Sequence, residues 1–95
     1  MKSIITTKKK CYICGSTYNL HTHHCLFGKN REKADKYGLT VVLCQEHHEG
    51  ACGVHGKHGH RLDIALKCLA QSAFVRRYGQ ELWDKEFGRN YLDEP

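Results

Sequence analysis

Proline and long hydrophobic runs are almost absent from this chain. Pro95 is the only proline among 95 residues, and with nine glycines the composition argues against a disordered segment. No apolar run approaches the roughly 18 residues that a membrane-spanning helix needs. The first ten residues, MKSIITTKKK, lack the apolar core of a signal peptide. We therefore expect a soluble, cytoplasmic protein that does not enter a membrane.

Histidine and cysteine, by contrast, are abundant. The chain has six cysteines and eight histidines, and all the histidines lie between His21 and His60. In a cytosolic protein, cysteines indicate metal binding or thiol chemistry more often than disulfides. A single domain of this length buries a limited fraction of its surface and often needs a staple. We therefore expect one small domain with a metal-rich middle segment.

Positive charge is concentrated in the same part of the chain. Residues 1–80 contain 13 Lys and Arg against 5 Asp and Glu, a net charge of +8, whereas residues 81–95 contain two against five, a net charge of −3. A basic body around a metal-rich segment is typical of a phosphate-binding surface. Many soluble proteins have a similar charge, so its sign alone selects no function.

The order of the predicted elements indicates an α+β fold. Residues 1–10 form a basic lead-in, residues 11–60 a metal-binding core and residues 62–95 a helical C-terminal part. In the core, YNLHTHH and LTVVLC are expected strands, and the loop between them, CLFGKNREKADKYG, includes one helical turn. QEHHEG then begins a helix that Gly50 cuts short.

The C-terminal part has the spacing of two helices. From Leu62 to Phe74 the apolar residues fall on one helical face, and Lys67 is expected largely elsewhere. This stripe is a core face or a dimer face, and the core reading is favoured. QELWDKEF predicts a second, short helix, whose Trp83 and Phe87 should pack back onto the domain.

Two pairs of metal-binding residues have the spacing of zinc knuckles. Cys11-x2-Cys14 is separated by 29 residues from Cys44-x2-His47. A hairpin between the pairs would bring them together, and the resulting structural Zn²⁺ site would stabilise a domain this small. His48 is the alternative fourth ligand, but the two-residue gap favours His47. In the plainer alternative, Cys44 is a core cysteine and His47 merely a helical residue.

The adjacent pair His23–His24 and the remaining His48 indicate a second site. Neighbouring side chains of a strand face opposite ways, so His23 and His24 should not share one metal in the same manner. We expect one member of the pair to be a metal ligand and the other to be a base.

At this point the motifs resemble a known family. CxxC, HH at the end of a strand, a strand ending in LC and then CxxHH are together similar to the HNH nucleases of the ββα-metal (His-Me finger) fold. The pattern looks most like the small phage HNH proteins related to the recombination nuclease Ref. The resemblance covers about residues 11–60, with weaker support from FGRNYL near the C-terminus.

This resemblance implies roles for three histidines. His24 would be the general base that activates water, and His23 and His48 would hold a catalytic divalent cation. Imidazole titrates near neutrality and can take a proton from water, while a cation stabilises charge on the phosphate and on the leaving 3′ oxygen. Imidazole ligands leave the cation open among Mg²⁺, Mn²⁺, Ni²⁺ and Zn²⁺. Family chemistry implies products with 5′-phosphate and 3′-hydroxyl ends.

The sequence departs from the family pattern in two places. Leu39 stands where HNH enzymes usually have an asparagine, and Asn30 is the only asparagine near enough to replace it, with Asp35 as a competitor. The helix that normally continues after the second ligand pair is interrupted by EGACGVHG, which brings His55 close as a possible extra ligand.

The remaining residues of interest have weaker assignments. Three basic residues flank the predicted site and could contact DNA phosphates, although solvated charge is an equal alternative for each: Lys29, Arg31 and Arg61. His21 shares a strand face with His23, but a surface or supporting role is favoured for it. Other residues are expected to be solvated loop histidines or small buried thiols: His58, His60, Cys25, Cys52 and Cys68.

The sequence therefore predicts a metal-dependent HNH endonuclease that cuts DNA, acting in phage recombination or DNA processing. The alternative is a zinc-stabilised nucleic-acid-binding module without catalysis. A thiol redox protein built on CYIC is a poor third, because no βαβ setting surrounds that motif. DNA is the expected partner. Cutting both strands would suggest a homodimer, and a recruiting protein is the alternative to nonspecific cleavage because no extended recognition element is apparent.

Overall fold

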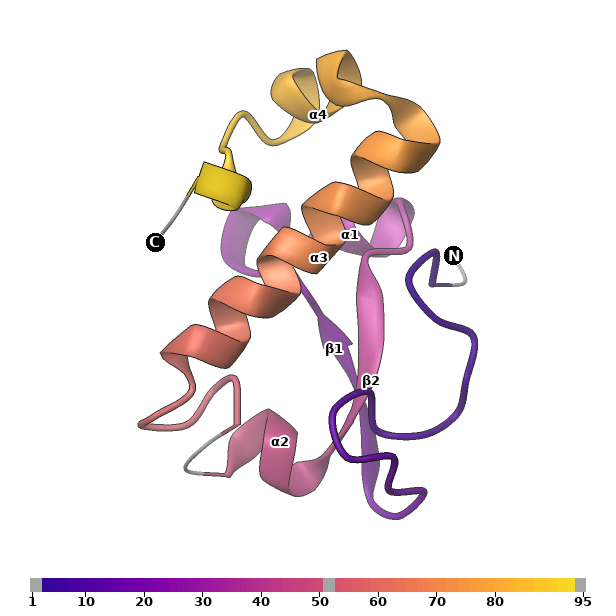
Figure 1. Ribbon diagram of the computed structural model, residues 1–95, viewed down its shortest axis with the longest axis vertical. Helices are drawn as coiled ribbons and strands as arrows, with labels where there is room; N and C mark the ends of the chain where they lie inside the picture. The colour runs from indigo at the N-terminus through magenta and orange to yellow at the C-terminus, as the bar shows by residue number, and fades with distance from the viewer. Residues whose placement is uncertain (1–2, 51–52, 94–95) are drawn as a thin grey trace.

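The computed structural model describes residues 3–50 and 53–93, and its centre is a two-stranded antiparallel sheet (Figure 1). Strand β1 (Leu20–His24) pairs with β2 (Thr40–Cys44), with His23 opposite Val41. Both strands lie within the predicted segments. Because residues that oppose each other in a ladder share a face, His23 lies on the face of Val41, and His24 lies on the opposite face with Thr40.

The segment between the strands contains more helix than the single turn expected. A 3-10 turn, η1 (Gly28–Asn30), leads directly into α1 (Arg31–Lys36), whose Ala34 is fully buried. Gly28 has a φ of +67°, which favours glycine, and it allows the chain to leave β1 and enter this turn. The position of α1 beside the end of β1 matters for the site, because Asp35 lies on it.

Helix α2 (Gln45–Glu49) follows β2 without a loop and ends at Gly50, as the sequence predicts. The chain then folds back on this helix, since the backbone N–H of His55 donates to the carbonyl of His48 at 3.0 Å. The loop is tight: a Cβ on Gly59 would collide with the carbonyl oxygen of Gly53. This tight return places His55 beside α2.

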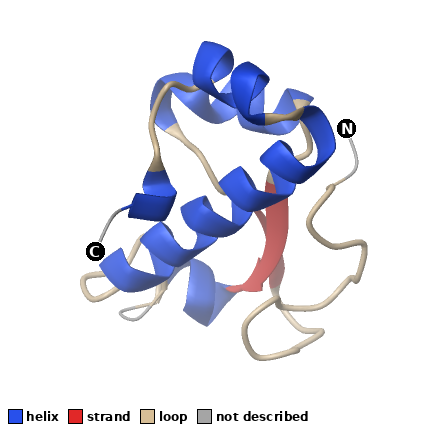
Figure 2. Ribbon diagram, turned by 45° about the horizontal axis from the view of Figure 1, so that its top comes forward, coloured by secondary structure: helices blue, strands red, loops and turns tan. Residues whose placement is uncertain are grey.

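The longest element, α3 (His60–Tyr78), crosses the sheet and carries the main apolar core (Figures 1 and 2). It begins two residues before the predicted Leu62. Its buried residues join Val41 and Leu43 of the sheet in one core: Leu66, Ala70 and Phe74. The core interpretation of the apolar stripe is therefore confirmed. Gln71 is also buried, which the apolar pattern did not indicate, and its Oε1 accepts the Tyr91 backbone N–H at 2.7 Å.

The C-terminal residues close over the end of α3, as expected. Helix α4 (Gln80–Glu86) buries Trp83 completely, and the Trp83 ring lies 4.4 Å from the Phe87 ring, centroid to centroid. The Trp83 indole donates to the Arg89 carbonyl at 2.8 Å. A final 3-10 turn, η2 (Tyr91–Asp93), packs against α3. No helix in the described part of the chain is long and apolar enough to cross a membrane.

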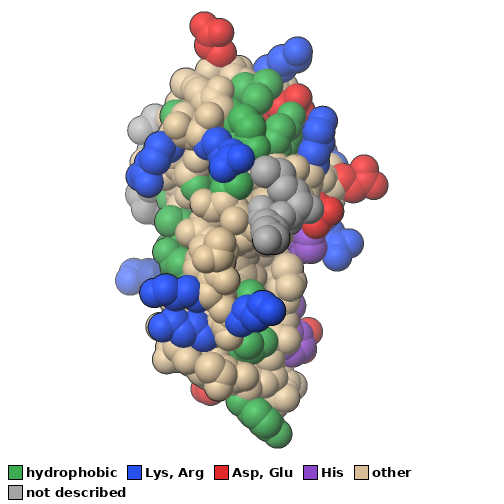
Figure 3. Space-filling view, turned by 90° about the vertical axis from the view of Figure 1, so that its right-hand side faces the viewer, with side chains coloured by type: hydrophobic (Ala, Val, Ile, Leu, Met, Phe, Trp, Pro, Cys, Tyr) green, Lys and Arg blue, Asp and Glu red, His purple; other side chains and the backbone are tan. Residues whose placement is uncertain are grey.

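The N-terminal segment, residues 3–19, runs beside β2 without forming a helix or strand (Figure 1). Backbone hydrogen bonds join Ile4 to Gly38 at 2.9 Å and Tyr12 to Val42 at 2.8 Å. The predicted basic lead-in is exposed at Lys8, and Lys and Arg side chains are spread over this side of the molecule (Figure 3). The segment brings the first cysteine pair to the sheet.

Candidate functional site

The two predicted zinc knuckles meet at the end of the sheet where β2 is followed by α2. The structure brings Cys11, Cys14, Cys44 and His47 together there. One ligand atom from each of the four residues lies within 4.8 Å of all the others. The Cys14 and Cys44 sulfurs are 3.8 Å apart, and the Cys44 sulfur is 3.2 Å from His47 Nδ1. Tetrahedral zinc with Zn–S bonds of about 2.3 Å places two sulfur ligands about 3.8 Å apart. These four residues could therefore bind a metal such as zinc.

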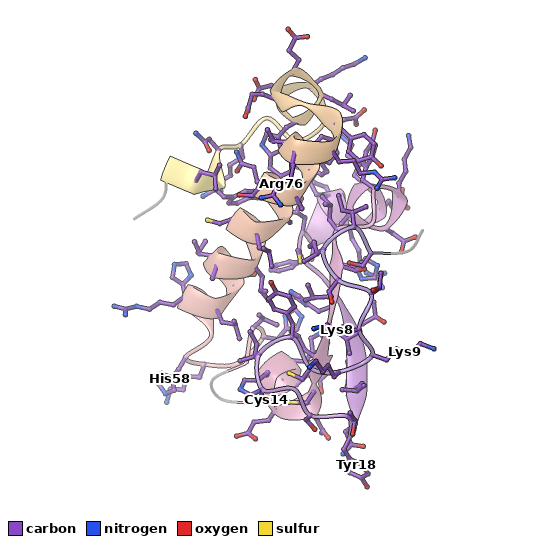
Figure 4. All side chains as sticks on the ribbon, turned by 45° about the vertical axis from the view of Figure 1, so that its right-hand side comes forward. Lys8, Lys9, Cys14, Tyr18, His58 and Arg76 are labelled. Atoms are coloured by element: carbon purple, nitrogen blue, oxygen red, sulfur yellow. The ribbon has the colours of Figure 1, made fainter. Side chains whose placement is uncertain are left out.

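Short local structures present each ligand pair. The first pair lies in a turn in which the Gly15 N–H donates to the Cys11 carbonyl at 2.9 Å, and Gly15 has a φ of +77°. The second pair spans the junction of β2 and α2, with Cys44 as the N-cap residue and His47 in the helix. Figure 4 shows Cys14 beside α2. His47, and not its neighbour His48, completes this set.

The electrostatics of Cys11 suit a metal ligand. Burial raises the pKa of its thiol, but hydrogen bonds from the backbone of Cys14, Cys44 and Ile13 outweigh this effect and lower the pKa to about 6. The thiolate is the form that binds zinc. Cys11 is almost fully buried, so the set combines a protected sulfur with the exposed Cys14.

A second group, the histidine trio of His23, His48 and His55, lies on the other side of α2. The His48 ring centroid is 5.3 Å from that of His23 and 4.8 Å from that of His55, and the trio offers three ring nitrogens within 4.8 Å of one another. In the described part of the chain, His23 Nε2 and His48 Nδ1 are buried without a hydrogen-bond partner. Each buried polar atom without a partner lowers the stability of the folded protein by about 1–3 kcal/mol. A bound cation would remove this cost, so the trio fits a metal.

Burial also keeps His23 neutral. It lowers the pKa of His23 to about 4, and the nearby His48, His55, His24 and Lys67 add to the effect. Burial likewise lowers the pKa of His48, and the nearby His55 lowers it further. A neutral imidazole has a lone pair that can bind a metal, which a protonated one lacks. The trio is therefore ready to bind a cation at neutral pH.

His24 lies apart from the trio, as the alternation of the strand requires. Its Nε2 is 3.2 Å from Asp35 Oδ1, and its side chain is 17% exposed. A carboxylate only accepts hydrogen bonds, so this contact places the imidazole proton on Nε2 and the lone pair on Nδ1. The two residues line a cavity of about 310 Å³ together with Arg31 and Glu32.

The other predicted residues are distributed more loosely. Asn30 precedes α1 as its N-cap residue and makes no side-chain cap hydrogen bond, and it is Asp35 that contacts His24. The catalytic role of Asn30 stays a prediction. Several side chains are exposed, including that of His58, which Figure 4 labels at the loop before α3: Lys29, Arg31, Arg61, His58 and His60.

The three remaining cysteines have different surroundings. Cys25 is fully buried, as expected, and burial together with Asp63 raises the pKa of its thiol to about 12. Cys68 packs against the core as expected but is only half-buried, and its thiol donates to the Tyr91 carbonyl at 3.1 Å. Cys52 lies outside the described residues.

Sequence reasoning missed the surroundings of the trio on α3. Lys67 was expected away from the core face, but its side chain is 16% exposed, with Nζ 2.9 Å from Asp63 Oδ2 and 4.5 Å from the Phe27 ring centroid. The Phe27 ring in turn lies 5.6 Å from that of His55. The i, i+4 spacing of Asp63 and Lys67 was the available signal.

Comparisons of the chain with protein-family models, curated proteins and solved structures gave no match. The chemistry of the site therefore rests on its own residues and their geometry.

Proposed function

We propose that the protein is a metal-dependent endonuclease of the HNH type that hydrolyses DNA phosphodiester bonds. The observation that carries this proposal is the contrast between the two metal-binding groups. The first has four ligands and is closed, as structural zinc sites are, whereas the trio has three, which leaves a coordination position open. An open coordination position together with a second, differently held imidazole is what a hydrolase needs and a structural site does not.

His24 is the base in this proposal. Its contact with Asp35 fixes the ring and leaves Nδ1 free to take a proton from the attacking water. His24 is close enough to the trio to contribute to the low pKa of His23. The carboxylate also stabilises the imidazolium that forms, so Asp35 is a positioning residue for the base.

The trio would hold the cation. His23, buried on β1, would give one ligand, and His48 and His55 approach it from α2 and its return loop. A divalent cation held there, Mg²⁺, Mn²⁺, Ni²⁺ or Zn²⁺, would stabilise charge on the scissile phosphate and on the leaving 3′ oxygen. Three imidazoles favour a transition-metal cation over magnesium.

DNA is the proposed substrate because the site lies in a basic body. Arg31 lines the same cavity as His24, and Lys29 in η1 and Arg61 at the start of α3 are exposed, so that all three could contact backbone phosphates. Such contacts carry no sequence information, so sequence preference is not part of the proposal. The role in phage recombination or DNA processing, the cytoplasmic location and a homodimer or recruiting partner are proposed on the family resemblance alone.

A plasmid-nicking assay tests the proposal. Purified protein and the His24→Ala variant would be assayed with each of the four cations, and the zinc content of both would be measured. We expect the wild type to nick and the variant to lose activity by at least about a hundredfold while it keeps its zinc. His58→Ala is the matched control, since His58 is exposed and should leave the rate unchanged.

If neither protein cleaves DNA with any cation but both bind it, the alternative function takes over: a zinc-stabilised nucleic-acid-binding module. If His24→Ala instead cleaves DNA as fast as the wild type does, the assignment of His24 as the base is refuted.

A further inference from the structure

His48 belongs to two groups of metal-binding side chains, and only one of them is the histidine trio. The second group is His21, His48 and Glu49, which also offers three ligand atoms within 4.8 Å of one another. The His21 and His48 ring centroids are 5.2 Å apart, and His48 Nδ1 is 3.9 Å from Glu49 Oε1. Nδ1 is also one of the buried nitrogens without a hydrogen-bond partner in the described chain.

The two-residue spacing of β1 explains why both groups meet at His48. His21 and His23 are two apart on the strand, so both point to the face that α2 approaches. His48 therefore lies beside both rings, at centroid distances of 5.2 Å and 5.3 Å. His55 extends the set on the His23 side, and Glu49 extends it on the His21 side.

A shared neutral imidazole cannot serve both groups at once. Its ring has one nitrogen with a lone pair and one with a proton, so it donates to one cation at a time. Binding a second cation would require a fully deprotonated ring, which does not form at neutral pH without strong metal assistance. Occupation of one group therefore withdraws His48 from the other.

We propose that His21, His48 and Glu49 form a second, inhibitory cation site that excludes a cation from the histidine trio. Two imidazoles and one carboxylate are a ligand set that zinc accepts, with a position left for water. Zinc at this site would take His48 from the trio and reduce it to two ligands. The inhibitory role rests on the proposed nuclease function, whereas the existence of the site does not.

Calorimetric zinc titration of protein that already contains its structural zinc tests the site itself. His55→Ala removes a ligand from the trio alone, and Glu49→Gln removes one from the second group alone. We expect wild type, His55→Ala and Glu49→Gln each to bind one further zinc. The double variant should bind it at least about tenfold more weakly than His55→Ala does. His55→Ala with Glu46→Gln is the matched control, because Glu46 is exposed on the same helix outside both groups.

Two results would overturn the inference. If adding Glu49→Gln to His55→Ala leaves the zinc affinity unchanged, Glu49 is no ligand and the second site does not exist. If the wild type binds two further zinc ions, the groups do not exclude each other. Circular dichroism of each variant shows whether a loss of binding reflects unfolding.

A cleavage assay tests inhibition separately. With activity supported by nickel or manganese, added zinc should inhibit the wild type, and Glu49→Gln should need at least about tenfold more zinc for the same inhibition. Equal inhibition of both proteins would refute the inhibitory role. An inactive wild type would refute the nuclease proposal, while the titration would still decide whether the site exists.

Discussion

At the scale of single residues, each of two pairs of adjacent histidines places its two imidazoles in different surroundings. His23 and His24 are neighbours in a strand and face opposite ways, so one joins the trio and the other meets Asp35. His47 and His48 are neighbours on a helix, where successive side chains are turned by about 100°, so one joins the cysteines and the other the trio. Each pair places one imidazole in each of two environments within a very short chain.

The contact between Asp35 and His24 leads to a residue-scale prediction. Asp35→Asn removes the carboxylate that holds the Nε2 proton and orients the ring, so we expect kcat to fall by about 10- to 100-fold with little change in KM. Asp35→Glu should recover part of kcat. Steady-state cleavage of a labelled duplex measures both constants.

Glu32→Gln is the control for this prediction, because Glu32 lines the same cavity without bonding His24. A kcat that falls equally in Asp35→Asn and Glu32→Gln would show that charge in the cavity matters, and not the orientation of the base.

At the scale of elements, the sequence predicted what local periodicity encodes. LTVVLC is β-branched and apolar, and it forms β2; the apolar spacing after Leu62 forms α3 and its buried face. The CxxC and CxxH spacings predicted the four-residue set because each pair is presented by one turn. In each of these cases the residues that determine the structure are close in sequence.

The missed features depend on contacts between distant segments. Asp35 meets His24 only because α1 packs beside the end of β1, and Lys67 lies near His23 only because α3 crosses the sheet (Figure 1). Gln71 is polar and yet buried because Asn90 and Tyr91 return to it from the C-terminal turn. Spacing within one element contains no information about such neighbours.

The return loop between α2 and α3 gives a prediction about an element. Gly59→Ala would place a Cβ against the Gly53 carbonyl and force the loop that holds His55 to shift. We expect nickel affinity at the trio to fall by about tenfold and stability by about 1–3 kcal/mol, with the structural zinc retained. Calorimetric nickel titration and thermal unfolding measure the two effects.

Lys57→Ala is the matched control in the same loop, since Lys57 is exposed. If Gly59→Ala binds nickel as tightly as the wild type does, the loop does not determine the position of His55.

At the scale of the whole molecule, the four-residue set joins parts that otherwise have few contacts. Residues 3–19 contain no helix or strand, and among the described residues one backbone hydrogen bond, from Tyr12 to Val42, joins them to β2. Cys11 is the residue of this segment that is almost fully buried in the core, and its ligand partners lie on β2 and α2. A metal there would tie the N-terminal segment to the sheet and hold α2, and with it His48, in place.

Removal of this metal should therefore loosen the N-terminal segment and the trio together. In Cys14→Ala, the three remaining ligands, the buried Cys11 among them, lose the fourth, so we expect loss of zinc, a fall in Tm of more than about 10 °C and loss of cleavage. Cys68→Ala is the control, because Cys68 is half-buried but outside the set, and it should keep its zinc and most of its stability. Metal analysis and thermal unfolding of the same samples test this prediction. If Cys14→Ala contains no zinc and yet unfolds at the wild-type temperature, packing alone holds the N-terminal segment, and metal binding by the four residues does not stabilise the domain.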